Sequence, residues 1–92
     1  MPDQPMESAK PIRLSMHAKE NAERRGASEA EVAECIRHAA WRPADGGRQE
    51  CRMDFGFHLE WNGQRYDTKQ VRPIFIEEDA EIVVITVYTY YF

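Results

Sequence analysis

The last stretch of the chain, residues 80–92, most constrains how the protein can fold. It contains neither glycine nor proline, and no charge after Glu81. Its β-branched and aromatic side chains favour an extended strand, because they pack well on a pleated, half-buried surface. With a period of two, Val83, Ile85 and Val87 share one face, and the other face begins apolar and ends in hydroxyl groups. We therefore predict an inner strand of a sheet that is covered on at least one side.

The size and composition of the chain exclude several classes of protein. A chain of 92 residues forms one small domain with a modest core. No apolar run is long enough to span a membrane, and the first residues lack the apolar core of a signal peptide. We therefore expect a cytoplasmic protein with no membrane contact. Residues 1–11 are interpreted as a mobile tail and residues 12–92 as a single domain.

The charge of the chain counts against general binding to polyanions. The formal net charge is −4, whereas proteins that hold nucleic acid through their overall charge are basic. The acidic excess is local, however, because Glu77, Glu78, Asp79 and Glu81 lie within five positions. Basic residues gather instead in the N-terminal part of the chain, which leaves room for a small cationic surface there.

The two cysteines, Cys35 and Cys51, fit neither a metal-binding spacing nor a disulfide framework. Cys35 and His38 are one helical turn apart, as metal ligands can be. No further ligand converges on them in the sequence, and Cys35 lies on an apolar stripe. We therefore predict no metal, no cofactor and two buried thiols in a reducing compartment.

The N-terminal segment predicts a first helix with a defined start and end. Residues 12–15 alternate between apolar and polar, so they form either a short edge strand or a simple lead-in. Ser15 can act as the N-cap, because its hydroxyl can accept a hydrogen bond from an unpaired backbone N–H. The helix then covers residues 16–25. Gly26 follows at the position where a left-handed residue is favoured.

A second helix is indicated by the capping box that Ser28 and Glu31 form. An apolar stripe at helical spacing supports this helix and consists of Val32, Cys35, Ile36 and Ala39. Pro43 ends the helix by about Trp41, because the residue before a proline disfavours helical geometry. Residues 45–47 are interpreted as a loop.

The next segment predicts a hairpin. Residues 51–61 alternate between apolar and polar, which is typical of a half-buried strand with one wet face. Asn62-Gly63 is a strong signal for a two-residue turn. Such a turn fixes three pairs: Glu60 with Arg65, Leu59 with Tyr66, and His58 with Asp67. The return strand continues to about Ile76, with a bulge or an edge near residues 71–73.

Together these elements predict an α+β fold. Two N-terminal helices are expected to pack on one face of an antiparallel sheet of three to four strands.

Three short motifs resemble those of a small uncharacterised bacterial family. They are Ser15-x-His17-Ala18, Arg25-Gly26-x-Ser28 and, near the end, Thr86-x-Tyr88. The family is related to the RelE/ParE toxins of the barnase–EndoU–colicin–RelE ribonuclease superfamily, in which two helices precede an antiparallel sheet. The resemblance covers about residues 12–90. Family members usually carry a second arginine four residues after the histidine, where this chain has Asn21.

The resemblance implies RNA cleavage without a metal, in which the ribose 2′-hydroxyl attacks the neighbouring phosphate. His17 matches the family histidine and would act as acid or base. Arg25 would hold the phosphate, and Thr86 and Tyr88 would donate to the phosphate or orient the ribose. The residues alone also allow a simpler interpretation. His17 is then an exposed helix residue, Arg25 a cation at a helix end, and the other two are strand formers.

A substrate-binding surface is the second prediction. His58, Lys69 and Arg72 would form a cationic patch on the wet face of the hairpin, although a cross-strand His58–Asp67 pair and solvated charges explain them as well. The aromatic end of the chain, residues 88–92, either stacks on bases or belongs to the core and a self-association edge.

The sequence therefore favours a toxin-like protein that acts on RNA, a metal-free endoribonuclease neutralised by an antitoxin-like protein. The alternative is a non-catalytic protein-interaction module of the same fold that binds a partner or a second copy through its last strand. The two hypotheses differ in one arrangement. A nuclease should gather His17, Arg25, Lys69 and Arg72 on one surface away from the acidic turn, whereas a binding module need not.

Overall fold

The structure, a computed structural model, describes residues 10–92. In chain order its elements are β1 (Ile12–Leu14), α2 (Met16–Arg25), α3 (Glu29–His38), β2 (Arg42–Ala44), the 3₁₀ turn η1 (Asp45–Gly47), β3 (Arg48–Glu50), β4 (Met53–Trp61), β5 (Gln64–Glu77) and β6 (Ile82–Tyr91). Most of the expected mobile tail, residues 1–9, lies outside the described residues. Lys10 forms an ion pair with Glu77 at 3.0 Å, so the described chain is attached to the sheet from its first residue.

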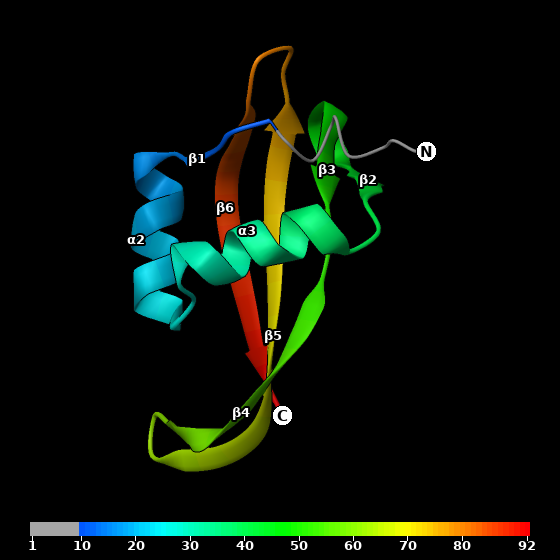
Figure 1. Cartoon of the computed structure of the whole chain (residues 1–92). Helices are drawn as coiled ribbons and strands as arrows, with labels where there is room; N and C mark the ends of the chain where they lie inside the picture. The colour runs from blue at the N-terminus through cyan, green and yellow to red at the C-terminus, as the bar shows by residue number, and fades with distance from the viewer. Residues whose placement is uncertain (1–9) are drawn as a thin grey trace.

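The last strand, β6, lies inside the sheet, which confirms the prediction from its composition. It runs antiparallel to β5 and parallel to β1. The sheet has the order β1-β6-β5-β3-β2, and β4 pairs with β5 beside this path. In Figure 1, α3 crosses in front of β5 and β6, and α2 stands beside β6. Neither helix in the described part of the chain is long and apolar enough to cross a membrane.

The expected sheet of three to four antiparallel strands is wrong. Within residues 10–92 the sheet has six strands and is mixed, because β1 pairs in parallel with β6 and because the residues on either side of the expected loop at 45–47 form the strands β2 and β3. The RelE-like fold expected from the resemblance is wrong in the same respect. Pro43, interpreted as a helix terminator, lies in β2, an edge strand where a missing N–H is tolerated.

Both helices begin where their caps predicted. The Ser15 hydroxyl accepts a backbone N–H of the first turn at 3.1 Å, and both hydrogen bonds of the capping box at Ser28 are present. Gly26 follows α2 with a φ of 85°, the left-handed conformation that terminates the helix. Local side-chain chemistry thus determines the ends of α2 and the start of α3.

The hairpin of β4 and β5 contains the predicted turn, since Asn62 and Gly63 both have positive φ. The pairs Glu60–Arg65 and Leu59–Tyr66 are confirmed. The expected register pair of His58 with Asp67 is replaced by a bulge between Gly56 and Leu59, where His58 has a φ of 53°. A second register shift, between β5 and β6, lies at residues 74–75, just beyond the predicted position.

The core lies between the helices and one face of the sheet. Its most buried residues include Ala18, Ala22, Val32, Cys35 and Ile36 from the helices and Val71, Phe75, Val84 and Val87 from the strands. Because side chains alternate along a strand, the neighbours of these strand residues point away from the helices. The opposite face therefore carries the register pairs Arg72–Tyr88 and Ile74–Thr86.

Candidate functional site

Two arginine side chains approach the ring of Tyr88, one from each side of β6, the strand that carries this tyrosine. The guanidinium carbon of Arg25 lies 5.1 Å from the ring centroid, and that of Arg72 lies 5.3 Å from it. Both distances fall within the range of cation–π attraction. Arg72 is the register partner of Tyr88 on β5, and Arg25 ends α2 on the other side of β6 (Figure 1). The fold thus joins three residues to which the sequence assigned roles.

Arg72 is oriented by two partners. Its Nε donates to the carboxylate of Glu50 at 2.5 Å, and its Nη1 donates to the hydroxyl of Tyr90 at 3.2 Å. The hydrogen bond between Arg72 and Glu50 lowers the pKa of the Glu50 carboxyl and raises the pKa of Arg72. The pair therefore stays charged at neutral pH and holds the guanidinium near the ring of Tyr88. The sequence did not reveal Glu50, because its pairing requires β3, which was not predicted.

A pocket of about 220 Å³ opens beside Tyr88. It is lined by Ala44, Asp45, Arg48, Arg72, Ile74, Thr86 and Tyr88. This volume is below the usual range for drug-sized ligands and suits a smaller group, such as a phosphate or one base. Two of its charged residues, Asp45 and Arg48, were not predicted, because residues 45–47 were interpreted as a loop and β3, which begins at Arg48, was not expected.

Thr86 connects this pocket to α2. Its hydroxyl donates to the side-chain oxygen of Asn21, which is buried. The resemblance led us to expect an arginine at position 21, and here Asn21 joins the helix to β6. His17 and Arg25 lie four residues before and after Asn21, so the three share one face of α2. His17 is exposed in the first turn.

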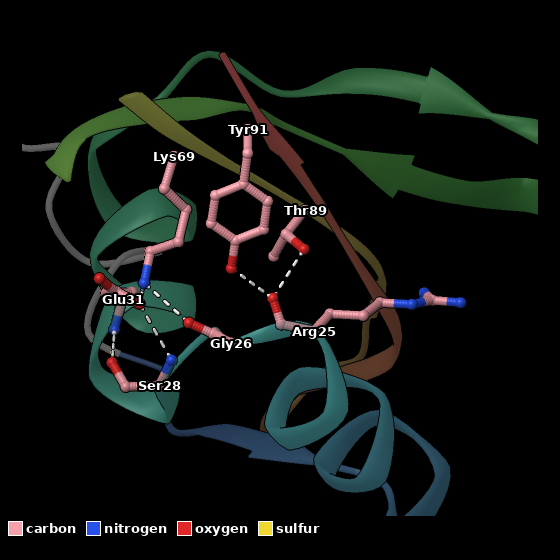
Figure 2. A network of polar contacts seen from close by, with 7 residues as sticks. All are labelled: Arg25, Gly26, Ser28, Glu31, Lys69, Thr89 and Tyr91. Carbon is pink, nitrogen blue, oxygen red and sulfur yellow. Dashed lines mark hydrogen bonds and ion pairs between the residues drawn. The ribbon is translucent and has the colours of Figure 1, made fainter. Parts of the chain in front are cut away.

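Lys69 is not part of this surface. It is three residues from Arg72 in a regular part of β5, so the two side chains point to opposite faces. Its Nζ donates to the carbonyl of Gly26 at 2.8 Å and forms an ion pair with Glu31 at 2.8 Å (Figure 2). Only 7% of Lys69 is exposed. The structure therefore places this predicted substrate-binding residue in a contact between α3 and the end of α2.

The aromatic end of the chain divides between the two faces of the sheet. Tyr91 packs against three rings of the hairpin, Phe57, Trp61 and Tyr66, at centroid distances of 5.1, 4.9 and 5.8 Å. Its burial raises the pKa of its hydroxyl. Tyr88, Tyr90 and Phe92 remain exposed. These exposed rings are the ones available to a ligand.

His58 has a different environment from the other predicted residues. It lies in the β4 bulge, with its Nδ1 3.5 Å from the Asp67 carboxylate, and both side chains are mostly exposed. Neither residue lines the pocket beside Tyr88. Of the seven predicted site residues, Arg25, Arg72, Thr86 and Tyr88 come together, His17 lies at the opposite end of α2 from Arg25, and Lys69 and His58 lie elsewhere. The arrangement expected of a nuclease is therefore present only in part, because Arg25 and Arg72 meet while Lys69 lies on the other face of the sheet.

The edge of β6 that faces away from β5 is occupied over most of its length. β1 pairs with residues 82–84. Beyond them, the carbonyl of Ile85 accepts from the Ser15 hydroxyl at 3.4 Å, and that of Val87 accepts from Arg25 at 2.8 Å. A partner strand therefore has no free edge along this part of β6.

The two cysteines are buried, as predicted, and they contact each other in the core, which the sequence did not predict. Their Sγ atoms are 3.4 Å apart, and both side chains are buried. The hydrogen bond to Cys35, together with burial, raises the pKa of the Cys51 thiol. Within residues 10–92, no three His, Cys, Asp or Glu side chains are arranged to hold a metal ion.

No family model, curated protein or solved structure matches this chain significantly. The function must therefore be argued from the residues of the chain itself.

Proposed function

We propose that the protein binds single-stranded RNA at the pocket beside Tyr88 and cleaves it without a metal, as a toxin-like endoribonuclease. One observation carries this proposal: Arg25 and Arg72 approach the same exposed tyrosine ring from two elements, beside a pocket that Thr86 also lines. Two guanidinium groups near hydroxyl donors suit a phosphodiester, because arginine presents several N–H donors in a fixed geometry.

The chemistry would be a transfer within the RNA backbone. A bond forms between the ribose 2′-oxygen and phosphorus, and the bond from phosphorus to the 5′-oxygen of the next nucleotide breaks. The products are a 2′,3′-cyclic phosphate and a 5′-hydroxyl. In this proposal the Tyr88 hydroxyl gives a proton to the leaving oxygen. His17 lies two helical turns before Arg25 and does not line the pocket, so its role as the base that takes the proton of the 2′-hydroxyl requires the RNA to run along α2 toward it. Arg25 and Arg72 stabilise the negative charge that develops on the phosphate.

The acidic charge of the chain is compatible with such a site if few phosphates are contacted. With Arg25 and Arg72 as the main phosphate contacts, the logarithm of the binding constant should fall against the logarithm of salt concentration with a slope of roughly −1.4 for single strands. A much steeper slope would indicate a broad cationic surface, and no slope would indicate a ligand without phosphate.

The test uses fluorescently labelled single-stranded RNA of mixed sequence in the presence of a chelator, with anisotropy for binding and gel analysis for cleavage. Arg72→Gln should weaken binding. His17→Ala should leave binding intact and slow cleavage by about 10²- to 10⁴-fold. Arg65→Gln, an exposed arginine of the hairpin, is the matched control for the loss of one positive charge and should behave as the original protein.

Induced expression in bacteria provides a second readout of the toxin-like role. Growth arrest that disappears with His17→Ala supports a ribonuclease centred on this histidine. In the same proposal, an antitoxin-like partner neutralises the protein in its host. Cleavage that survives His17→Ala would move the acid–base group to another residue.

The second candidate function is a non-catalytic protein-interaction module. The observation that favours it is the exposure of Tyr88, Tyr90 and Phe92, at 37%, 40% and 57%. Exposed aromatic residues with a neighbouring arginine are typical of protein-binding surfaces. An absence of both RNA binding and growth arrest would favour this function. Its surface would be the open face of the sheet, because the β6 edge is covered as far as Val87.

A further inference from the structure

Cys35 and Cys51 are placed for a covalent reaction that the proposed RNA site does not use. Cys35 belongs to α3, and Cys51 lies between β3 and β4, 16 positions later. Their Sγ atoms are 3.4 Å apart, in the centre of the contact between helix and sheet. They are the only two cysteines of the chain, so a disulfide within one molecule must join them.

The movement needed to form a disulfide is small. A sulfur–sulfur bond is about 2.05 Å long, so the two atoms must approach by roughly 1.4 Å from their distance of 3.4 Å. Changes in the side-chain torsions of the two cysteines must supply this approach. The packing of α3 on the sheet therefore positions the two thiols for oxidation.

A small oxidant has a route toward Cys51. A pocket of about 190 Å³ lies beside it and is lined by Ala40, Arg42, Glu50, Cys51 and Arg52. A water molecule occupies about 30 Å³ in the liquid, so this pocket has room for hydrogen peroxide. Cys35 does not line this pocket and is fully buried. Cys51 is therefore the cysteine nearer to a peroxide in the pocket.

We propose that Cys35 and Cys51 are an oxidation site that closes to an intramolecular disulfide when the protein meets a peroxide. The Cys51 thiol loses its proton and its sulfur attacks one peroxide oxygen, the O–O bond breaks, and a sulfenic acid and water are formed. Because burial and the contact with Cys35 raise the pKa of this thiol, the step should be slow at neutral pH and faster at alkaline pH. The Cys35 sulfur then attacks the Cys51 sulfur, and the hydroxyl leaves as a second water. Two thiols lose two protons and two electrons, and one hydrogen peroxide becomes two waters.

The disulfide would fasten α3 to the strands of the sheet. Cys35 and Cys51 are 16 positions apart, and a cross-link that closes a loop of this length removes conformational freedom from the unfolded chain. In a domain of this size, the melting temperature should rise on the order of 10 °C when the bond forms. The reduced and oxidised proteins thus differ in a quantity that is simple to measure.

The experiment compares the full chain before and after treatment with hydrogen peroxide, then repeats the comparison after a thiol reductant. Mass spectrometry of the unfolded protein should show the loss of two hydrogen masses in a monomer. A peptide map should show Cys35 linked to Cys51. The melting temperature should rise on oxidation and return to its first value on reduction.

Cys35→Ser and Cys51→Ser are the control variants, each checked for folding in its reduced form. Neither should lose two hydrogens, and neither should gain stability from peroxide. If Cys51→Ser does not fold, Cys51→Ala takes its place, because alanine keeps the apolar character of the site. The proposal is overturned if both thiols of the treated protein still react with iodoacetamide after unfolding. Oxidation that yields only cross-linked dimers or a sulfinic acid would overturn it too.

Discussion

The hydroxyl of Tyr91 donates to the backbone carbonyl of Arg25, with 2.6 Å between the two oxygen atoms. The hydroxyl of Thr89 donates to the same carbonyl at 2.9 Å (Figure 2). The last carbonyls of a helix have no partner within the helix, so such donors complete its C-terminal end. The final strand of the chain thus fixes the end of α2, which carries Arg25 toward the proposed site.

Tyr91→Phe should lower the free energy of unfolding by about 0.5–1.5 kcal/mol, because it removes one hydrogen bond to the Arg25 carbonyl. Tyr90→Phe is the matched control. Its hydroxyl accepts from Arg72 on the exposed face, where water can replace it, so its effect should be smaller. Urea denaturation measures both values. Equal effects of the two substitutions would contradict the role assigned to Tyr91.

Gly26→Ala should be more destabilising than Gly63→Ala. Both glycines have a φ above 80°, which costs other residues roughly 1–2 kcal/mol. A Cβ at Gly63 meets open space, whereas one at Gly26 would collide with the Tyr91 hydroxyl and lie 2.8 Å from the ring of Trp61. The collision should add about 1–3 kcal/mol. Denaturation of the two variants under the same conditions isolates this difference, and similar losses would rule out a close approach at Gly26.

Lys69→Met should destabilise the protein by about 1–3 kcal/mol, because Glu31 and the Gly26 carbonyl both lose a charged donor. Glu31→Gln and the double variant complete a mutant cycle. We expect a coupling energy of about 0.5 kcal/mol or more, since the two side chains are in contact. A Lys69→Met protein of unchanged stability that no longer binds RNA would instead support the substrate-binding role that the sequence suggested.

The parts of this fold that could be predicted depend on neighbouring residues. Ser15 caps α2, Ser28 caps α3 with Glu31, and Asn62-Gly63 turns the hairpin. In each case a short segment carries both the donor and the acceptor, or the backbone freedom, that the structure needs. Such signals are complete within a few positions of the sequence.

The parts that were missed depend on partners far along the chain. β1 pairs with β6 across 70 positions, and β3 pairs with β5 across 24 or more. Strands of three residues carry too little pattern to reveal such pairing, so the six-stranded sheet and the role of Glu50 were not foreseen. Lys69 is a different case. Its position three residues from Arg72 places the two on opposite faces of a regular strand, but the bulge expected near residues 71–73 would have put them on the same face. The structure has its register shift at residues 74–75 instead, so the alternation between Lys69 and Arg72 is unbroken.

Glu50→Gln should make the stability of the protein less dependent on pH in acid. Its hydrogen bond to Arg72 lowers the pKa of Glu50 in the folded protein below its ordinary value of 4.5. The charged carboxylate thus stabilises the fold above pH 4.5, and this contribution is lost as the pH falls through the lowered pKa. The variant should lose less stability over that interval. Glu81, whose pKa the Arg13 hydrogen bond also lowers, still titrates, so the dependence decreases without vanishing.

Urea denaturation between pH 3 and pH 7 measures this difference, with Glu34→Gln on the exposed side of α3 as the control for one lost carboxylate. The control should retain the pH dependence of the original protein. The same preparations link stability to the proposed site. Because Glu50 orients Arg72, Glu50→Gln should weaken RNA binding at neutral pH while Glu34→Gln does not. If Glu50→Gln leaves RNA binding unchanged, the Arg72 guanidinium keeps its position without the Glu50 carboxylate.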